Sequence, residues 1–261
     1  MKRFISDIQK YYKYTIYSAK AYLKDEVSSS HLNWLWWILD PIFMMLIYVF
    51  IFTIVFPGGS EPFFPAFIFL GITIWGFFER NISQSVKLIR ANKAIVTKVY
   101  IPKFILLIIT MTQNAFKMLI SFGIVIVMMI LYRVPLSINM LYIFLVMITL
   151  FLVTFACGTI LMHLGVFIDD LSNVVKIVLR LMFYMTGIFY SVPTRVPAPY
   201  GWWAVRINPL ALLLQSGRES LLYNTAPDVK WLLYWIVASI VVAAAGVAII
   251  YKNENGYAKV V

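Results

Sequence analysis

The sequence has little charge and few of the residue types from which catalytic and metal sites are built. Charged residues make up 13% of the 261 positions, about half of the ~25% that is usual in soluble globular proteins. The single cysteine, Cys157, lies in an apolar stretch, which excludes a disulfide framework and indicates a packing role. The only two histidines, His31 and His163, stand far apart, so we predict a hydrogen-bonded packing role for His163 and no metal site.

Motifs for fuel-driven transport are also missing. No G-x-x-x-x-G-K-[ST] phosphate loop occurs, so the sequence predicts no ATP site in this chain. The apolar stretches lack the series of Asp and Glu residues that a proton relay needs. We therefore expect a chain that is not an enzyme and binds no cofactor. Any active transport would draw its energy from a partner.

What the sequence does have is long apolar runs. Hydrophobic residues make up 62% of the chain, and several runs approach the ~20 residues that cross a ~30 Å hydrocarbon core as a helix. The fold class predicted is an all-α integral membrane protein with six transmembrane helices. The expected spans are 35–56, 63–78, 104–131, 140–168, 171–190 and 231–251. Together they form a transmembrane domain over 34–251, followed by a short polar tail over 252–261.

The first 33 residues have no continuous apolar run that would mark a cleavable signal peptide. They predict an amphipathic helix instead. Its apolar and aromatic face comprises Phe4, Ile5, Ile8, Tyr11, Tyr12, Thr15, Ile16, Ala19, Tyr22 and Leu23. Its basic face comprises Lys2, Arg3, Lys10, Lys13, Lys20 and Lys24. This pattern is typical of a helix lying in the membrane interface; packing on a soluble partner is the alternative, and both can hold at once.

Two polar features fall inside the predicted spans. Asp40 followed by Pro41 has the order of an N-cap and a first helical residue, so we predict a break near Asp40, with the spanning helix running on from Pro41. Asp40 would then be a cap rather than an ion-handling group. Lys117 lies early enough in the third span to reach the interface or find a partner.

Two further segments are too polar to cross the membrane. Glu79 to Lys103 interleaves basic and apolar residues and predicts one or two short amphipathic helices that end at Pro102. A motor protein could push on such a segment; a solvated basic loop on lipid headgroups is the alternative. Ser191 to Lys230 contains a short apolar run over Leu210 to Leu214, which predicts an interfacial or re-entrant helical hairpin.

The basic residues are distributed unevenly along the chain. The N-terminal segment and the 79–103 segment hold twelve of the 22 Lys and Arg residues, whereas the loop over 57–62 has none. Positive residues gather on the cytoplasmic side, so both termini are predicted to be cytoplasmic. The net charge of +11 is explained by anionic lipids, and no nucleic-acid partner is predicted.

Several motifs, in this order, resemble the permease subunit of ABC-2 type transporters, in the branch that exports lipid-linked cell-surface polysaccharide, O-antigen or wall teichoic acid. Trp34–Pro41 is similar to that family's start of span one, and Asn92–Pro102 to its cytoplasmic loop. Asp170-Leu171 matches half of an Arg-Asp-Leu motif. Asn208-Pro209-Leu210, with Arg218 downstream, matches the segment before the last span. Asp169 stands where the family has Arg, and Thr186–Tyr190 replaces a Ser-Pro-Ile-Phe-Tyr pattern.

The resemblance implies a homodimer of this chain in the inner or plasma membrane, bound to two copies of a separate nucleotide-binding protein that holds ATP and Mg. A coupling helix within Ser85–Lys98 would dock on that protein. The N-terminal helix would be an interface helix, and the 191–230 segment would form short exit helices. The candidate coupling residues are Ile89, Arg90, Asn92, Lys93, Ile95 and Lys98.

The leading functional hypothesis is ATP-driven export of an undecaprenyl-diphosphate-linked glycan or teichoic acid polymer. Aromatic rings lining a path between two chains would hold sugars weakly, and ordinary packing or lipid contact is the alternative role for each ring. The aromatic candidates are Phe43, Tyr48, Phe50, Phe52, Phe183, Tyr184, Phe189 and Tyr190. Arg3, Lys10 and Lys13 would attract the lipid diphosphate, and nonspecific attraction to anionic lipids explains them equally well.

Three other functions stay open at this point. A related permease could export a small hydrophobic molecule or drug, which needs no wide aromatic path. The chain could be a membrane anchor or assembly protein without transport, although the coupling-like loop argues against this. An enzyme acting in the membrane, such as a glycosyl- or phosphotransferase, is disfavoured because no paired catalytic acids are found near the interface.

Overall fold

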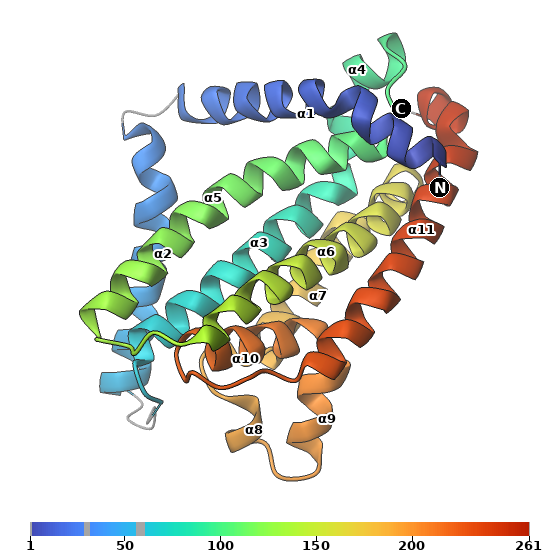
Figure 1. Cartoon of the computed structure of the whole chain (residues 1–261). Coiled ribbons are helices and arrows are strands. Elements are labelled where there is room, and N and C mark those ends of the chain that lie inside the picture. The colour runs from blue at the N-terminus through green and yellow to red at the C-terminus, as the bar shows by residue number, and fades with distance from the viewer. Residues whose placement is uncertain (1, 29–31, 56–60, 261) are drawn as a thin grey trace.

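A computed structural model describes residues 2–28, 32–55 and 61–260 of the chain, which are helical with no β-strand among them. The all-α prediction is confirmed. The first helix, α1 (Lys2–Ser28), lies across one end of the molecule, while α2 (Trp36–Phe50) runs down its side (Figure 1). A short 3₁₀ turn, η1 (Asn33–Leu35), precedes α2, and a π-helical turn, η2 (Ile51–Val55), follows it.

The core is built around α3 (Phe64–Ala91), whose first turns from Ala66 to Leu70 are fully buried. Helices α5 and α6 pack along α3, α2 and α7 contact it from other sides, and α11 packs on α6. The remaining long helices are α5 (Phe104–Leu131), α6 (Tyr142–Phe167, preceded by the 3₁₀ turn η3, Ile138–Leu141), α7 (Leu171–Met185) and α11 (Val229–Val260). A helix buried at the centre of such a bundle must be apolar on all sides, as the first half of α3 is.

Four helical segments among the described residues are long and apolar enough to cross a membrane. They are Trp36–Val55, Phe104–Leu131, Ile138–Phe167 and Val229–Glu254. These correspond to the first, third, fourth and sixth predicted spans. Helix α7 has 15 residues, about 22 Å at 1.5 Å per residue, and the second half of α3 carries Glu79, Arg80, Lys87 and Arg90.

The predicted break at Asp40 is wrong. Helix α2 begins at Trp36 and runs through Pro41 without interruption. Pro41 lies inside α2 as its sixth residue, where it removes the hydrogen bond that an N–H would have donated to the carbonyl of Trp37. Asp40 therefore caps nothing, and its side chain is exposed.

The polar 79–103 segment also differs from the prediction, because α3 does not end near Phe78 but continues to Ala91. No Gly or Pro interrupts it there, and Ile82, Val86 and Ile89 bury one continuous face against the bundle. Only α4 (Lys93–Lys98) is a separate short helix. The polar residues up to Ala91 thus lie on an extension of a core helix, and α4 follows that helix directly.

The segment over 191–230 forms short helices, as predicted. They are α8 (Val192–Arg195), α9 (Tyr200–Ile207) and α10 (Pro209–Leu221). Helix α10 is buried in the molecule, because Leu210 to Leu214 pack against α6 and α3. At the C-terminal end, α11 continues as helix through the residues predicted as a polar tail.

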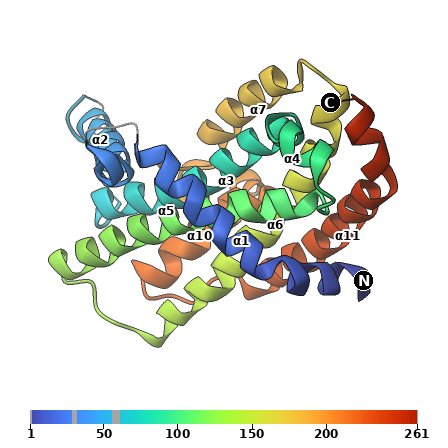
Figure 2. The ribbon, with the colours of Figure 1, turned by 90° about the horizontal axis from the view of Figure 1, so that it is seen from above.

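The two ends of the molecule are built differently. Both termini and α4 lie at the end that α1 crosses, and α8 and α9 lie at the opposite end (Figure 1). Figure 2 looks down on the first end, where α1 passes over α5. The two termini and the basic segment therefore share one side, as the charge distribution predicted.

A buried arginine fastens the end with the short helices. Arg218 of α10 is 2% exposed and donates hydrogen bonds to the carbonyl oxygens of Gly187 and Ile188, both at 2.8 Å. These carbonyls follow the last turn of α7, where no helical N–H reaches them. Asn208 caps α10 by accepting from the amides of Leu210 at 3.0 Å and Ala211 at 3.4 Å. The Asn-Pro-Leu…Arg pattern is thus a helix start and a clamp on the preceding chain.

Replacing Gly187 by alanine tests this turn. Its φ of +76° lies in the left-handed region, and an added Cβ would stand 2.5 Å from a methyl carbon of Val192. We expect Gly187→Ala to lower stability by about 1–2 kcal/mol from the backbone conformation alone, measured as a lower melting temperature of the purified chain in detergent. The matched control is Gly123→Ala in α5, whose added Cβ meets nothing within 4 Å. An unchanged melting temperature for Gly187→Ala would contradict the turn as described.

Candidate functional site

The junction between α3 and α4 is formed by one residue, Asn92. Its amide donates to the carbonyls of Leu88 and Ile89 and so ends α3, and its own carbonyl accepts from Ile95 at 3.0 Å and Val96 at 2.9 Å and so begins α4. Its side-chain amide donates to the carbonyl of Leu88 at 2.8 Å. The side-chain oxygen accepts from the hydroxyl of Tyr22 in α1 at 2.9 Å. Asn92 therefore fixes the bend and attaches it to α1.

Helix α4 projects from the end of the bundle (Figure 1). Its inward face carries Val96, which is buried, and Ile95, which is partly buried. Its outward face consists of Lys93, Ala94, Thr97 and Lys98, all exposed. Two lysines beside two small side chains form a surface that suits close contact with a polar or acidic protein groove.

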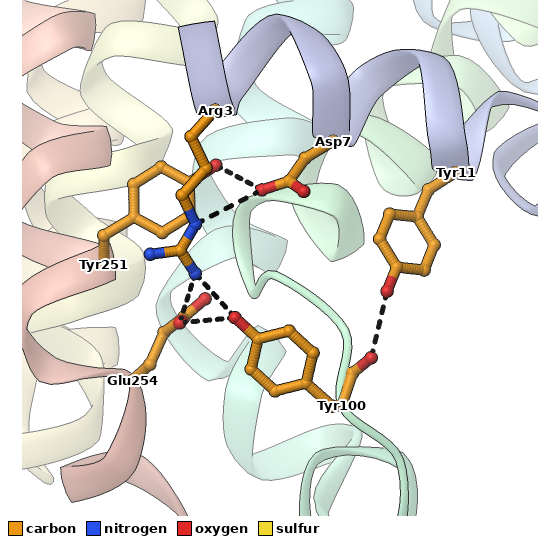
Figure 3. A network of polar contacts seen from close by, with 6 residues as sticks. All are labelled: Arg3, Asp7, Tyr11, Tyr100, Tyr251 and Glu254. Atoms are coloured by element: carbon orange, nitrogen blue, oxygen red, sulfur yellow. Dashed lines mark hydrogen bonds and ion pairs between the residues drawn. The ribbon is translucent and has the colours of Figure 1, made fainter. Parts of the chain in front are cut away.

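A polar network joins α4's C-terminal connection to both chain ends (Figure 3). The guanidinium of Arg3 donates to the hydroxyl of Tyr100 at 2.6 Å and to the carboxylate of Glu254 at 3.1 Å. The Tyr100 hydroxyl donates in turn to the same Glu254 oxygen at 3.0 Å. Arg3 belongs to α1, Glu254 to α11, and Tyr100 to the link between α4 and α5, so three segments far apart in sequence meet here.

A second set of contacts strengthens the same meeting point. The hydroxyl of Tyr251 donates to Asp7 at 2.6 Å, and the guanidinium of Arg3 lies 4.1 Å from the centre of the Tyr251 ring. Asp7 also lies 3.8 Å from Arg3, one helical turn away in α1. The hydroxyl of Tyr11 donates to the backbone carbonyl of Tyr100 at 3.1 Å. The backbone that follows α4 is thereby held against α1.

The strength of this network follows from its exposure. The carboxylates of Glu254 and Asp7 are 10% and 17% exposed, but the Arg3 side chain is 55% exposed, so water screens each ion pair to about 1 kcal/mol or less. Desolvation, together with the hydrogen bond to Glu254, raises the pKa of Tyr100, so the phenol keeps its proton and remains a donor at neutral pH. The network is ordered but can be broken and remade.

A separate contact ties the end of α3 to the turn between α6 and α7. Arg90 donates to the carboxylate of Asp169 and, at 2.6 Å, to the backbone carbonyl of Val166 near the end of α6. Asp169 is the residue that departs from the Arg-Asp-Leu pattern. In this chain it serves as the acidic partner of Arg90, so the departure has a structural use.

The candidate coupling residues are thus gathered at one place but differ in exposure. Ile89 and Arg90 lie in the last turn of α3, Asn92 at the junction, and Lys93, Ile95 and Lys98 in α4. Ile89 is 1% exposed and packs inside its own bundle. Lys93 and Lys98 are the members of the set that a partner can reach most directly.

The residues that hold α4 in place were missed by sequence analysis. Asp7 and Tyr100 are single polar residues in separate stretches of sequence, and Tyr251 and Glu254 lie together in a third stretch. Tyr100 falls within the loop motif, but nothing in its spacing shows which residues would meet it. Tyr251 and Glu254 stand at and beyond the predicted end of the last span. Only the fold brings them together.

The aromatic candidates divide into two groups. Tyr48, Phe52, Phe183 and Tyr184 surround Phe189, with ring centres 4.4, 5.0, 5.2 and 6.4 Å from that of Phe189. The hydroxyl of Tyr190 donates to the carbonyl of Tyr184 at 3.0 Å. In contrast, Phe43 and Phe50 lie on the exposed face of α2, at 51% and 55% exposure.

The basic candidates on α1 also differ in what they contact. Arg3 is engaged in the network just described. Lys10 lies 5.3 Å from the centre of the Tyr11 ring, and both Lys10 and Lys13 are exposed. His163 lies 2.8 Å through Nδ1 from the hydroxyl of Tyr257, in keeping with a packing role. No group of three or more His, Cys, Asp or Glu residues suited to a metal occurs in the described part of the chain.

Comparison with known proteins agrees with this geometry. The chain is 26% identical over 239 residues, 91% of each chain, to an O-antigen export system permease protein RfbA from Klebsiella pneumoniae. It is also 26% identical over 260 residues, 99% of each chain, to the RfbA protein of the same description from Myxococcus xanthus. Residues 17–222 match the family described as ABC-2 type transporter. That match covers most of the helices described above, and the chain belongs to the ABC-2 type transporter family.

Proposed function

We propose that this chain is the permease subunit of an ABC exporter in the cytoplasmic membrane and that α4 is the helix on which a separate nucleotide-binding protein acts. That partner, in two copies, would hold ATP and Mg. The observation that carries this proposal is the placement of α4: a short helix with an exposed basic face, fixed to a core helix and bonded to both chain ends. On this proposal both termini are cytoplasmic.

The proposed arrangement has six membrane helices in each subunit, with α3 and α7 joining the four apolar segments. Helix α3 is enclosed by its neighbours and so does not need the hydropathy of a lipid-facing helix. Helix α7 is short, but the turn after it is clamped by Arg218 inside the bundle. Its irregular backbone is thus satisfied by protein rather than exposed to lipid, as a membrane requires.

A homodimer is supported by the faces that one chain leaves uncovered. Along α2, the residues Phe43, Ile47, Phe50 and Ile54 form an exposed apolar stripe at helical spacing. Helix α7 is largely exposed as well, through Val174, Ile177, Val178 and Leu181. Two copies facing one another would enclose a path that a single six-helix chain cannot. Lipid would cover whatever part of these faces remains outside.

The cargo we propose is a glycan polymer linked to undecaprenyl diphosphate. The relatives at 26% identity carry the description of O-antigen export permeases, which supports this substrate class. The ring cluster around Phe189 joins α2 to the chain that follows α7, and Tyr184 is 62% exposed beside it. Aromatic faces of this kind hold sugar rings without fixing them, which suits a chain that must slide.

The network in Figure 3 suggests how movement would spread from α4. When a partner shifts α4, Tyr100 moves with it, and Tyr100 is bonded to α1 through Arg3 and Tyr11 and to α11 through Glu254. The interface helix and the last spanning helix would therefore respond to the same displacement. Pairs screened by water can rearrange in each cycle at a cost of about 1 kcal/mol.

Charge reversal on the outward face of α4 tests the docking role. We expect Lys93→Glu with Lys98→Glu to weaken binding of the nucleotide-binding protein at least tenfold, or about 1.4 kcal/mol, because two attractive charges become repulsive. Co-purification and permease-dependent ATP hydrolysis provide the measurement. Lys20→Glu serves as control, since Lys20 is an exposed lysine of α1 and lies outside α4. Unchanged assembly and ATP hydrolysis in the doubly reversed chain would remove α4 from the docking surface.

Paired substitutions test the network as the transmitting element. Tyr100→Phe removes two hydrogen bonds and leaves the direct contact between Arg3 and Glu254, and Glu254→Gln weakens the acceptor. We expect each to lower permease-dependent transport or ATP hydrolysis about two- to fivefold, or 0.5–1 kcal/mol. The two together should cost less than the sum of the two single effects, because both disrupt the hydrogen bond between Tyr100 and Glu254.

Binding of the nucleotide-binding protein should remain intact in both variants, which separates transmission from docking. Tyr17→Phe is the matched control, because Tyr17 lies on α1 at 76% exposure. Fully additive losses would mean that Tyr100 and Glu254 act independently, and the network would then not be the connection that carries the movement.

A further inference from the structure

A charged cleft of about 380 Å³ lies where α1, α2, α3 and α5 come together. Its lining includes Glu26 from α1, Trp36, Trp37 and Asp40 from α2, Arg80 from α3, and Lys117 from α5. Its lining residues come from the end of α1 and the start of α2, two helices that meet at one corner of the molecule in Figure 1. None of these residues belongs to the α4 site or to the ring cluster around Phe189.

Two of the four charges in the cleft neutralise one another. The ammonium of Lys117 lies 2.6 Å from each carboxylate oxygen of Glu26. It also lies 5.7 Å from the centre of the Trp37 ring. Lys117 is 12% exposed and Glu26 51% exposed, so the pair reaches from the interior of the cleft to its edge.

Arg80 is different, because its guanidinium forms no hydrogen bond or ion pair with any residue that the structure describes. Its Nε is buried and has no acceptor there. The carboxylates of Asp40, Glu79 and Glu26 attract it at longer range, but none forms an ion pair with it, and the side chain of Asp40 is exposed at the rim. Partial burial of an arginine whose N–H donors have no acceptor costs free energy unless a bound anion supplies the acceptors.

The position of the cleft indicates where that anion would come from. Tryptophans at the start of a spanning helix lie at the level of lipid headgroups, and Trp36 and Trp37 flank this cleft. An amphipathic interface helix lies at the same depth, and Glu26 is near its end. The planar fork of arginine binds phosphate through two parallel hydrogen bonds. Depth and donor geometry therefore both point to a lipid phosphate.

We propose that this cleft binds the phosphate group of a membrane lipid, with Arg80 as the bidentate donor and Lys117 as the second cation. The carboxylates of Glu26 and Asp40 balance the two cations, so the lining of the cleft has no net charge. Directed hydrogen bonds, rather than net electrostatic attraction, therefore hold the ligand. Where the lipid is the polyprenyl diphosphate of the cargo, the inference rests on the proposed function. It then moves the headgroup site away from Arg3, whose Nη2 already donates to Tyr100 and Glu254, and away from the exposed Lys10 and Lys13.

The test uses the whole 261-residue chain in micelles of a maltoside detergent, which carries no phosphate, without the nucleotide-binding protein. Undecaprenyl diphosphate and phosphatidylglycerol are titrated in separate arms, and retained lipid is counted by native mass spectrometry. We expect Arg80→Gln to weaken retention at least tenfold, because it removes a charged bidentate contact. Asp40→Asn should instead strengthen retention about threefold, because it removes a negative charge near the bound phosphate.

The control is Lys24→Gln, which removes one exposed positive charge from the same end of α1 but outside the cleft. The Lys24→Gln variant should retain as much lipid as the unchanged chain. Preference for undecaprenyl diphosphate would assign the site to the cargo, and equal retention of both lipids would assign it to bilayer phosphate in general. Equal losses in Lys24→Gln and Arg80→Gln would overturn the proposal, because attraction would then be nonspecific.

A misfolded chain can lose bound lipid, but it cannot show the gain in lipid retention that is expected of Asp40→Asn. If Arg80→Gln fails to fold, Asp40→Asn decides, since a structural role for the cleft predicts no gain in lipid retention. A gain supports the phosphate site and its absence overturns it. The outcome is also separable from the α4 experiments, because lipid is measured without the partner. Charge reversal on α4 should leave retention unchanged whether or not the partner binds.

Discussion

The constraint on which this structure depends is that a helix in a membrane must satisfy every backbone polar group without water. Within a helix this happens automatically, but the last carbonyls of each helix need donors from elsewhere. In this chain those donors are side chains of other helices. Arg218 serves the carbonyls after α7, Arg90 serves the end of α6, and Tyr11 serves the backbone after α4. The bonds that complete helix ends are also the bonds that connect the helices to one another.

These connections differ between the two ends of the molecule, and the difference matches what each end would do. Arg218 is 2% exposed, and breaking its bonds would leave a buried charge and two carbonyls unpaired, at a cost of several kcal/mol. Arg3, at the other end, is 55% exposed, and water replaces its partners at little cost. The buried clamp therefore acts as a fixed point, while the exposed network can open. The end of the molecule that carries α4 would have to follow a moving partner, and this needs contacts that can open, such as those of Arg3.

Sequence patterns predicted the elements that depend on local chemistry. The limits of α5 coincide with the predicted span 104–131, because an uninterrupted apolar run leaves no other structure. The partnership of Lys117 was anticipated, but its partner Glu26 lies 91 positions away and could not be. The Asp40-Pro41 prediction failed because the rule for helix starts is local and takes no account of the packing of α2 on α3 and α5. The extension of α3 to Ala91 was missed because the charged residues after Phe78 were taken to end the helix. Such residues end the lipid-facing part of a helix, but the helix itself can continue beyond them.

The candidate sites show the same division between local and distant information. Asn92 was a candidate in advance only through its place in the Asn92–Pro102 motif, and it is the structure that shows it ending α3 and beginning α4. In the sequence, Arg80 is one of several cations in a basic stretch. The structure distinguishes it because its buried Nε has no acceptor among the described residues. A sequence can supply a charge, but only the fold decides whether that charge is already paired. Lys117 and Arg80 line the same cleft, and pairing separates them: Lys117 is neutralised by Glu26 of α1, whereas the donors of Arg80 have no acceptor among the described residues.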